Sequence, residues 1–351
     1  MSGPFGSTLK SEEYLKEGVY FIRVQDIKQR FFLEKESMIC ISEKSNSKIK
    51  NSELQIGDLV VSKVGNTIGL IARIDEEMQR ANVSENNIGI KLRNYSEDTK
   101  YAILTFLNSK YGQNQILRRV SGNAQPKLNV FNFTELKIPI LSKPFQFIIE
   151  EIVKAAYQKQ IKSKELYREA ENSLLSELGL LNYEVKNTLA FSTTKKEIKQ
   201  VKRYDAEYFQ PKYDEIVEAI KKYRGGFDKL GNLVTIKKSV EPGSEAYQES
   251  GIPFVRVSNI SKFEISNNNQ QFISEKLYEE LKSYQPKKGE ILLSKDATPG
   301  MAYYLDNDPK KMIVSGGILR LKVDSEKILP EYLTLVLNSK IVQQQIERDA
   351  G

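Results

Sequence analysis

The sequence predicts an α/β (α+β) protein with two homologous domains that are separated in the chain by one long helix. Two observations lead to this prediction. Several blocks of sequence occur twice in the same order, and an uninterrupted helical pattern lies between the copies. Stacked repeats have periods of about 20 to 50 residues, whereas these copies are the size of domains. Two domain-sized copies indicate two similar sites in one chain.

The repeated blocks are three in number and keep their order. The first is a glycine followed by an apolar strand pattern that contains an arginine, and its copies are displaced by 233 residues. The blocks lie at residues 18–27 and 251–260, 57–63 and 289–295, and 107–110 and 337–340. Three blocks in register indicate duplicated domains.

The composition is that of a soluble globular protein. A chain of 351 residues, 40% hydrophobic and 28% charged, can bury the cores of two or three domains. No stretch approaches the roughly 18 apolar residues of a membrane span, and no signal peptide is visible. The single cysteine, Cys40, excludes an internal disulfide framework and indicates a reducing cytoplasm. We interpret it as a small buried hydrophobe.

The absence of histidine excludes several kinds of chemistry. Without histidine the chain has no Ser-His-Asp or Cys-His site, no histidine general base and no His-ligated zinc or iron. The net charge of +7 favours a polyanionic partner, although many basic proteins bind no nucleic acid.

In the first copy, runs rich in β-branched residues and bounded by Gly, Asn and Asp predict short strands. These runs are residues 19–24, 58–62, 68–73 and 88–92. A helix is expected from about Tyr101 to Val120, because apolar residues there recur at helical spacing. The loop 121–127 closes the domain, and residues 136–140 predict a last strand, which prolines end.

The segment from Phe145 to Leu178 predicts a single long helix. It contains no Gly or Pro, its apolar residues recur every three or four positions, and Gly179 follows as a stop. Its length would be about 50 Å. Because Gln160 and Ser163 interrupt the apolar stripe, the helix needs a partner. We favour half of an antiparallel coiled coil over an ordinary core helix, since no other helical bundle is visible.

These patterns divide the chain into five segments. A polar linker follows the long helix, and a short helix from about Pro211 to Tyr223 leads into the second copy. The predicted segments are 1–143 for the first domain, 144–180 for the long helix, 181–203 for the linker, 204–226 for the short helix and 227–351 for the second domain.

A set of motifs in a fixed order carries a family resemblance. The motifs are residues 2–7, the Gly-x-x-Phe-x-Arg-Val strand of both copies, residues 63–69, the Leu-Asn-Ser-Lys block, residues 125–128 with 138–139, the long helix, and residues 204–209. Each motif is common, but their order around a central helix is specific. Over essentially its whole length the chain resembles the specificity (S) subunit of Type I restriction-modification enzymes.

The resemblance implies a DNA-binding subunit without catalysis of its own. In this family two target recognition domains each read one half of a split sequence in double-stranded DNA. The helices between them set the spacing and dock methyltransferase subunits, to which endonuclease/translocase subunits can be added. S-adenosylmethionine is then expected on the partner, and no cofactor on this chain. In agreement, the sequence has no Asp/Asn-Pro-Pro-aromatic motif, no Gly-x-Gly-x-x-Gly loop and no Walker A pattern.

The chain departs from the family pattern at both ends. It holds about one and a half repeats, because the first copy has no equivalent of residues 204–236 and the second ends before an equivalent of residues 125–128. The central helix is therefore expected to have no partner helix within the chain. Either the chain is a fragment or a rearranged gene product, or self-association through residues 145–178 supplies the missing helix.

The candidate DNA-binding residues lie on glycine-flanked turns and beside the loop that closes the first domain. Base reading needs polar side chains at base edges, and positioning needs phosphate anchors. The candidates are Lys63, Asn66 and Thr67 on the first turn, Lys295, Asp296 and Thr298 on the second, and Arg118, Arg119, Asn123, Gln125, Lys127 and Arg348 near the closing loops. No catalytic or metal-binding residue is assigned.

Each candidate also has a structural interpretation. The first turn could be a β-hairpin with a solvated lysine, and Asp296 could simply form a turn. Arg23 and Arg256, in the repeated strands, are expected to be structural ion-pair partners. Two other functions compete with DNA recognition: a silent scaffold that only captures a methyltransferase, and a carboxylate-metal nuclease. Glu264, Asp296 and Asp306 are too scattered in sequence to favour the nuclease.

Overall fold

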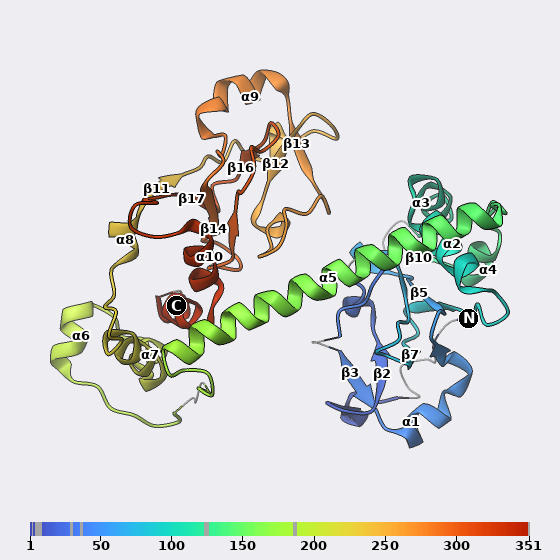
Figure 1. The fold of residues 1–351 in the computed structure, drawn as a ribbon, viewed down its shortest axis with the longest axis horizontal. Coiled ribbons are helices and arrows are strands. Elements are labelled where there is room, and N and C mark those ends of the chain that lie inside the picture. The colour runs from blue at the N-terminus through green and yellow to red at the C-terminus, as the bar shows by residue number, and fades with distance from the viewer. Residues whose placement is uncertain are drawn as a thin grey trace. The chain divides into compact units, whose positions relative to one another are not determined.

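The computed structural model describes residues 1, 3, 9–28, 31–35, 38–122, 126–184 and 188–349. The chain forms two compact units, Met1–Ser163 and Lys164–Gly351. Figure 1 shows the fold, with the long helix α5 (Lys143–Glu177) contributing residues to both units. None of the helices in the described part of the chain has the length and apolar character of a membrane span.

In the described part of the first unit, strands form two main sheets and a short hairpin. The larger sheet has the order β1-β3-β2-β7-β4, the second has the order β6-β5-β8, and β9 pairs with β10. The strands are β1 (Tyr14–Leu15), β2 (Val19–Ile22), β3 (Ile39–Ile41), β4 (Leu54–Gln55), β5 (Leu59–Ser62), β6 (Ile71–Arg73), β7 (Arg80–Val83), β8 (Asn87–Ile90), β9 (Val120–Ser121) and β10 (Lys127–Leu128). β2 pairs with β7 in parallel, and its other pairing is antiparallel.

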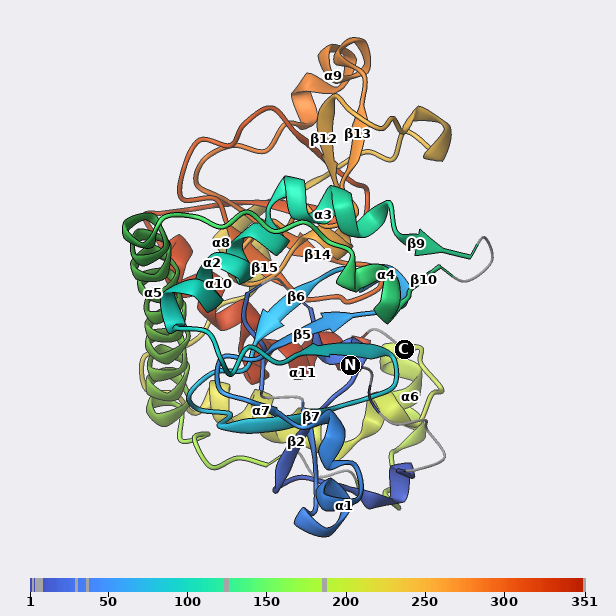
Figure 2. The same cartoon turned by 90° about the vertical axis from the view of Figure 1, so that its right-hand side faces the viewer.

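The helices of the first unit cover its sheets. They are α1 (Glu43–Lys48), α2 (Glu97–Asn108), α3 (Lys110–Leu117) and α4 (Val130–Thr134), followed by α5. Leu104 and Leu107 of α2 pack with Leu59 and Ile71 in one buried cluster, so α2 lies over β5 and β6 (Figure 2). The apolar faces that the sequence predicts are thus buried between the small sheet and the helices.

Two predicted elements of the first unit are wrong in detail. The helix expected over 101–120 is two helices, because Ser109 caps the second and its hydroxyl accepts a hydrogen bond from the backbone N–H of Gly112. The strand expected over 136–140 is absent from this described segment, which forms no ladder with any strand and leaves Ile140 fully exposed. A short helix, α4, which the sequence analysis did not predict, precedes it.

In the first unit, α5 packs on α2 and on the segment after β2. Val153 is buried in the same cluster as the α2 residues. Tyr157 stacks on Phe32 with ring centroids 4.4 Å apart, and its hydroxyl donates to Asp75 Oδ2 at 2.5 Å. Burial, together with this bond to a carboxylate, raises the pKa of Tyr157. The aromatic stack and the hydrogen bond therefore fix the helix to this unit.

The opposite side of α5 in this unit is apolar and exposed. Phe145, Ile148 and Ile152 are 51%, 50% and 64% exposed. Their spacing of three and four residues places them along one stripe of the helix. We call these three residues the α5 stripe.

In the described part of the second unit, strands again form two sheets. Their orders are β11-β17-β14-β15 and β13-β12-β16. The strands are β11 (Val234–Lys238), β12 (Ile252–Val255), β13 (Gln271–Ile273), β14 (Glu290–Ser294), β15 (Ala302–Tyr304), β16 (Ile313–Val314) and β17 (Ile318–Val323). The helices after α5 are α6 (Lys195–Val201), α7 (Pro211–Lys221), α8 (Leu230–Leu233), α9 (Glu275–Leu281), α10 (Pro330–Asn338) and α11 (Lys340–Asp349).

An ion pair is buried in the larger sheet of the second unit. Glu290 on β14 and Arg320 on β17 form two hydrogen bonds of 2.8 and 3.0 Å, and both side chains are almost fully buried. Burial by itself raises the pKa of Glu290, but the hydrogen bonds from Arg320 and from the Lys287 backbone N–H hold it below the ordinary value of a glutamate. The carboxylate therefore stays charged in the core.

The part of α5 in the second unit packs on α7, α10 and α11. Leu174, Leu175, Ile216 and Ile341 share one buried cluster. Tyr167, on the same part of α5, meets the ring of Phe263 edge-on at 5.1 Å, and burial raises its pKa to about 12. The C-terminal end of the long helix is thus a core element of the second unit.

The repeated sequence blocks adopt the same local structure. Gly18 and Gly251 precede the equivalent strands β2 and β12 with φ values of 137° and 136°. A Cβ at either position would lie 2.5 Å from a carbonyl oxygen of the neighbouring strand, so only glycine fits. The predicted fold class, α/β (α+β) with two homologous domains and a long helix between them in the chain, is confirmed.

The Leu-Asn-Ser-Lys block has the same structural role in both copies. The Asn108 Nδ2 donates to the carbonyl oxygens of Ile71 and Leu104, at 3.0 and 3.1 Å. In the second copy, Asn338 Nδ2 donates to Ala302 and Thr334, at 2.8 and 3.1 Å. Each asparagine therefore ties the end of a helix to the sheet strand beside it.

Candidate nucleic-acid interface

The first predicted turn joins β5 to β6 and is closed by backbone hydrogen bonds. The Ser62 N–H donates to the Leu70 carbonyl oxygen at 3.0 Å, and the Gly69 N–H donates to the Ser62 carbonyl oxygen at 2.9 Å. Gly65 has a φ of 76°, and a Cβ built on it would meet no atom within 4 Å. The tip of the turn is therefore open, and left-handed backbone shapes it.

Lys63, Asn66 and Thr67 occupy different positions on this turn. Asn66 is exposed at the tip. Thr67 is half-buried, and its hydroxyl lies 2.8 Å from the Ser62 hydroxyl, so it stabilises the turn from inside. The Lys63 Nζ donates to the Glu85 carbonyl oxygen at 3.2 Å. Contact of these residues with DNA stays a prediction, and Asn66 is the most accessible of them.

The β9–β10 hairpin lies against the turn. Leu128 N–H donates to the Lys63 carbonyl at 2.9 Å, and Val64 forms a bridge with Lys127. The fold thus brings Lys127, which is exposed, beside Lys63 and Asn66, although more than 50 residues separate them. Two segments that the sequence analysis proposed independently form one surface.

The remaining first-copy candidates differ in accessibility. Arg118 is exposed, and within the described residues its side chain makes no hydrogen bond or ion pair. Arg119 donates to the carbonyl oxygens of Gln115 and Glu135, both at 3.0 Å, and so holds the chain that follows α4. Asn123 and Gln125 lie outside the described residues.

The second predicted turn repeats the closure of the first. Gly300 N–H donates to the Ser294 carbonyl at 2.8 Å, and Ser294 N–H to Met301 at 2.9 Å. Ala297 takes the left-handed position with a φ of 58°. The turn is one residue shorter than the first, with Thr298 following the left-handed residue as Asn66 does.

The candidates on the second turn are all exposed. Lys295 and Asp296 form an ion pair of 3.5 Å between Nζ and Oδ2, and Thr298 is exposed beside them. Because Asp296 offsets the lysine charge, this turn offers a carboxylate acceptor as well as a cation. The position of Asp296 is compatible with the predicted contact to cytosine N4, which stays a prediction.

Arg348 is turned into the protein. Its Nη1 lies 3.0 Å from Asp214 Oδ1, its Nε donates to the Tyr208 carbonyl at 3.1 Å, and its guanidinium stacks over the Tyr208 ring. The side chain is 21% exposed. These contacts join α11 to the start of α7, and contact of Arg348 with DNA stays a prediction.

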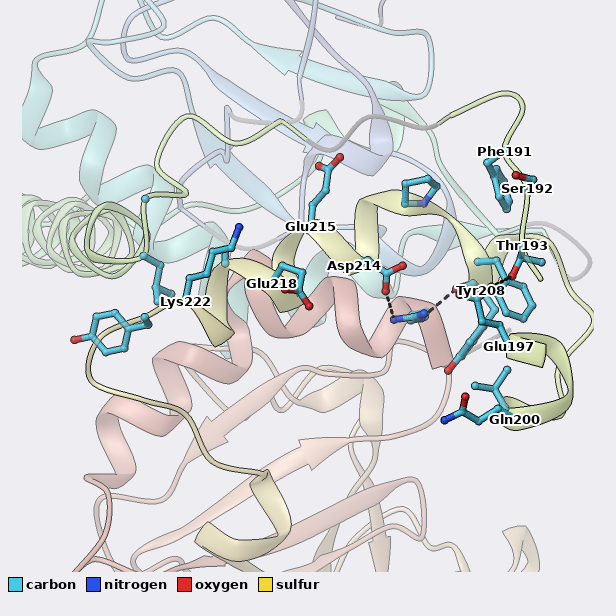
Figure 3. A pocket seen from close by; sticks show the side chains of 18 of the residues that line it. Phe191, Ser192, Thr193, Glu197, Gln200, Tyr208, Asp214, Glu215, Glu218 and Lys222 are labelled. Atoms are coloured by element: carbon cyan, nitrogen blue, oxygen red, sulfur yellow. Dashed lines mark hydrogen bonds and ion pairs between the residues drawn. The ribbon is translucent and has the colours of Figure 1, made fainter. Parts of the chain in front are cut away.

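A large groove of about 1260 Å³ runs beside α7 in the second unit (Figure 3). Its charged lining consists of Glu177, Glu197, Asp214, Glu215, Glu218, Lys222, Arg224 and Arg348. Five carboxylates face three cations there, so the groove repels a phosphate backbone. We therefore do not include this groove in the candidate nucleic-acid interface.

Arg23 is the expected structural ion-pair partner, whereas Arg256 bonds to a backbone carbonyl instead. Arg23 forms an ion pair with Asp26 at 3.1 Å, and Arg256 donates to the Asn269 carbonyl at 2.7 Å. Within the described residues, no group of three or more acidic or cysteine side chains is arranged to hold a metal ion.

Comparison with known proteins identifies the second copy. Residues 227–348 match the family model described as Type I restriction modification DNA specificity domain. The resemblance to Type I specificity subunits that the sequence predicts is thereby confirmed. The specificity domain contains the second turn, with Lys295, Asp296 and Thr298.

Solved structures of low sequence identity also match the chain. One is a Type I restriction-modification S subunit from M. genitalium, at 13% identity and a TM-score of 0.36, covering 99% of this chain and 75% of that one. Another is an HsdS subunit from Thermoanaerobacter tengcongensis, at 13% identity and a TM-score of 0.30, covering 97% and 78%. A search of curated proteins gave no match.

The sequence analysis overlooked one exposed amide beside the first turn. Lys63 N–H donates to the carbonyl oxygen of Asn86 at 3.0 Å, which places Asn86 next to the Lys63 turn. In the specificity domain Lys295 N–H donates to Gly317 at 2.9 Å in the same way. An alignment of the two copies would place Asn86 opposite Gly317, and this difference is the sequence signal that could have identified Asn86.

Proposed function

We propose that the chain is the DNA-recognition subunit of a Type I restriction-modification system that works in the cytoplasm. In this proposal each copy of the specificity domain reads one half of an asymmetric, interrupted site in double-stranded DNA. One observation carries the proposal: the same fold occurs twice with the same turn closures, while the exposed residues on the turns differ. Unlike side chains on like scaffolds are what recognition of unlike half-sites requires.

We further propose that the α5 stripe docks a helix of another subunit. Three neighbouring large apolar side chains that are half exposed or more are costly in water unless a partner covers them. The partners would be adenine-N6 methyltransferase subunits, with endonuclease subunits added, or a second copy of this chain. The proposed subunit performs no catalysis, and S-adenosylmethionine binds to the methyltransferase.

The test is to express the chain in cells with an adenine methyltransferase subunit and to sequence the methylated adenines. The proposal expects methylation at one interrupted sequence that depends on this chain. Exchange of residues 1–140 for another such domain should alter one half-site only. Chain-dependent methylation at no defined sequence would contradict the proposal.

The competing scaffold function is separated by a binding experiment. A gel shift with the purified chain, with and without the methyltransferase, tests whether the assembly retains DNA. Capture of the methyltransferase without any DNA retention would support the scaffold. Metal-dependent cleavage by the purified chain alone would instead support the nuclease.

A further inference from the structure

A small hollow of about 510 Å³ lies in the first unit between three loops. The loops are the 3₁₀ helix Val24–Asp26, the turn after β5 and the turn between β7 and β8. The polar part of its lining includes Arg23, Gln25, Asn66, Thr67, Ser84, Glu85 and Asn86. The hollow is rich in carboxamides.

Three amide side chains of this lining are exposed: Gln25, Asn66 and Asn86. Arg23 holds Gln25 in place. With the Gln25 amide turned so that its oxygen faces the guanidinium, Arg23 Nη2 and Nη1 donate to that oxygen at 3.0 and 3.2 Å. Arg23 is itself fixed by two hydrogen bonds of 3.1 Å to Asp26. Within the described residues, Asn66 and Asn86 have no side-chain partner, so their carboxamides are available to a ligand.

The specificity domain keeps the scaffold of this hollow and changes these three side chains. In the first copy the Arg23 backbone N–H donates to Asp26 Oδ2 at 2.8 Å. In the second copy the Arg256 backbone N–H donates to Asn259 Oδ1 at 3.0 Å in the same way. The positions of Gln25, Asn66 and Asn86 hold Ser258, Thr298 and Gly317. A Cβ on Gly317 would lie 3.2 Å from Asp296 Oδ2, so the second copy presents a carboxylate where the first has an amide.

The chemistry of the hollow suits base edges better than phosphates. Glu85 lines it, and a carboxylate beside a phosphate would be repelled. A free carboxamide, as in Asn66 and Asn86, carries a donor and an acceptor side by side, which matches N6 and N7 of adenine in the major groove. The oxygen of Gln25 is taken by Arg23, so Gln25 offers only its N–H donors. We assign phosphate contacts instead to the basic residues of the neighbouring turn and hairpin, Lys63 and Lys127.

We propose that Gln25, Asn66 and Asn86 are the base-reading residues of the first domain, and that they read an A·T pair other than the one that is methylated. This inference rests on the proposed function, because it assumes that the first domain meets DNA. It goes beyond the proposed function by naming the side chains that determine the first half-site and the base pair that they select.

The experiment replaces each amide by the residue of the second copy, giving Gln25→Ser, Asn66→Thr and Asn86→Gly. These residues already occur on the same scaffold, so the fold should persist, and equal thermal unfolding midpoints would verify this. Asn94→Ser, an exposed asparagine of the same domain outside the hollow, is the matched control. The full chain is expressed with the methyltransferase, and methylated adenines are sequenced.

We expect discrimination at one A·T position of a single half-site to fall at least about fivefold for one or more of the three variants. The other half-site and the control should match the unaltered chain. If the unaltered chain methylates a defined site and all three variants keep its full discrimination, the inference is overturned while the proposed function stands. Relaxation of both half-sites would also overturn it, and absence of site-specific methylation by the unaltered chain would overturn both.

Discussion

Gln113 and Gln343 make the same two hydrogen bonds from equivalent helices of the two copies. Gln113 Nε2 donates to the carbonyl oxygens of Gly69 and Leu107, both at 2.9 Å. Gln343 Nε2 donates to Gly300 and Leu337, both at 2.8 Å. In each copy, one side chain therefore connects the glycine that closes the candidate recognition turn to the end of a helix.

Removing this connection should loosen the turn. Gln113→Ala leaves two carbonyl oxygens without a donor, so the free energy of unfolding of the first unit should fall by about 1–3 kcal/mol. Denaturant unfolding measures it, with the exposed Asn94→Ala as control. A loss no larger than that of the control would show that water replaces the glutamine.

Much of this arrangement could be predicted from the sequence, and some of it could not. The long helix and the start of the strand predicted over 19–24 are confirmed, because their periodicity and glycine limits are local signals; the strand itself ends at Ile22. The break at Ser109 was missed, since a capping serine inside an apolar helical pattern looks like an ordinary residue. The strand over 136–140 was wrong because strand propensity does not supply a partner strand.

The sequence predicted where the candidate site lies in the chain, but it did not predict which residues contact one another there. The duplicated glycine turns located both loops, because a left-handed residue needs a recognisable sequence. Nothing local reveals that Arg348 meets Asp214, which is distant in sequence. Asn86 was missed for the same reason: its place beside Lys63 arises from tertiary folding.

Lys63 and Lys295 test the phosphate contacts. If each contacts a phosphate, Lys63→Ala and Lys295→Ala should weaken binding to all sequences and reduce the slope of log affinity against log salt by about 1 each. Titrations of duplex DNA at several salt concentrations, with the methyltransferase present, measure this. Lys44→Ala, an exposed lysine on α1, is the control. An unchanged slope would reject the assignment for that lysine.

The buried Glu290–Arg320 pair should make the second unit sensitive to acid. The folded pKa of Glu290 lies below its unfolded value, so the charged carboxylate stabilises the fold above that value, and this contribution is lost as the pH falls through the folded pKa. Glu290→Gln should cost about 3–5 kcal/mol at neutral pH and flatten the acid limb of stability.

The control for this prediction is an exposed pair. Glu279 and Lys282 lie 3.1 Å apart with side chains 50% and 62% exposed. Glu279→Gln should therefore change the free energy of unfolding by less than about 1 kcal/mol. Equal effects of Glu290→Gln and Glu279→Gln would mean that the buried pair contributes little.

Tyr157 should fix α5 to the first unit through its hydroxyl as well as its ring. Tyr157→Phe keeps the stack on Phe32 but removes the hydrogen bond to Asp75, so stability of the first unit should fall by about 1–3 kcal/mol. Since the pKa of Tyr157 is raised in the fold, the unaltered protein should also lose stability as the pH rises above about 10. Persistence of that alkaline loss in Tyr157→Phe would point to another group.

A charge placed in the α5 stripe should impair assembly with a partner without impairing folding. Ile152→Asp places a charge on a surface that is already exposed, so thermal unfolding of the isolated chain should change little. Association with the methyltransferase or with a second chain should weaken at least tenfold, because a buried unpaired charge is costly. Lys159→Asp, on an exposed position further along α5, is the control in co-purification and sedimentation experiments. Unimpaired association of Ile152→Asp would remove the stripe from the interface.

The first copy builds the Glu290–Arg320 pair differently: Asp58 occupies the position of Glu290 and lies 3.7 Å from the exposed Arg93. Gly89 lies opposite Val60 in the first sheet, where Arg320 lies opposite Leu292 in the second, and a Cβ on Gly89 would be 2.9 Å from Leu54. A single strand transplanted from one copy to the other would therefore leave an unpaired charge or collide with its neighbours. Exchange of a whole domain, by contrast, would carry each charge together with its partner.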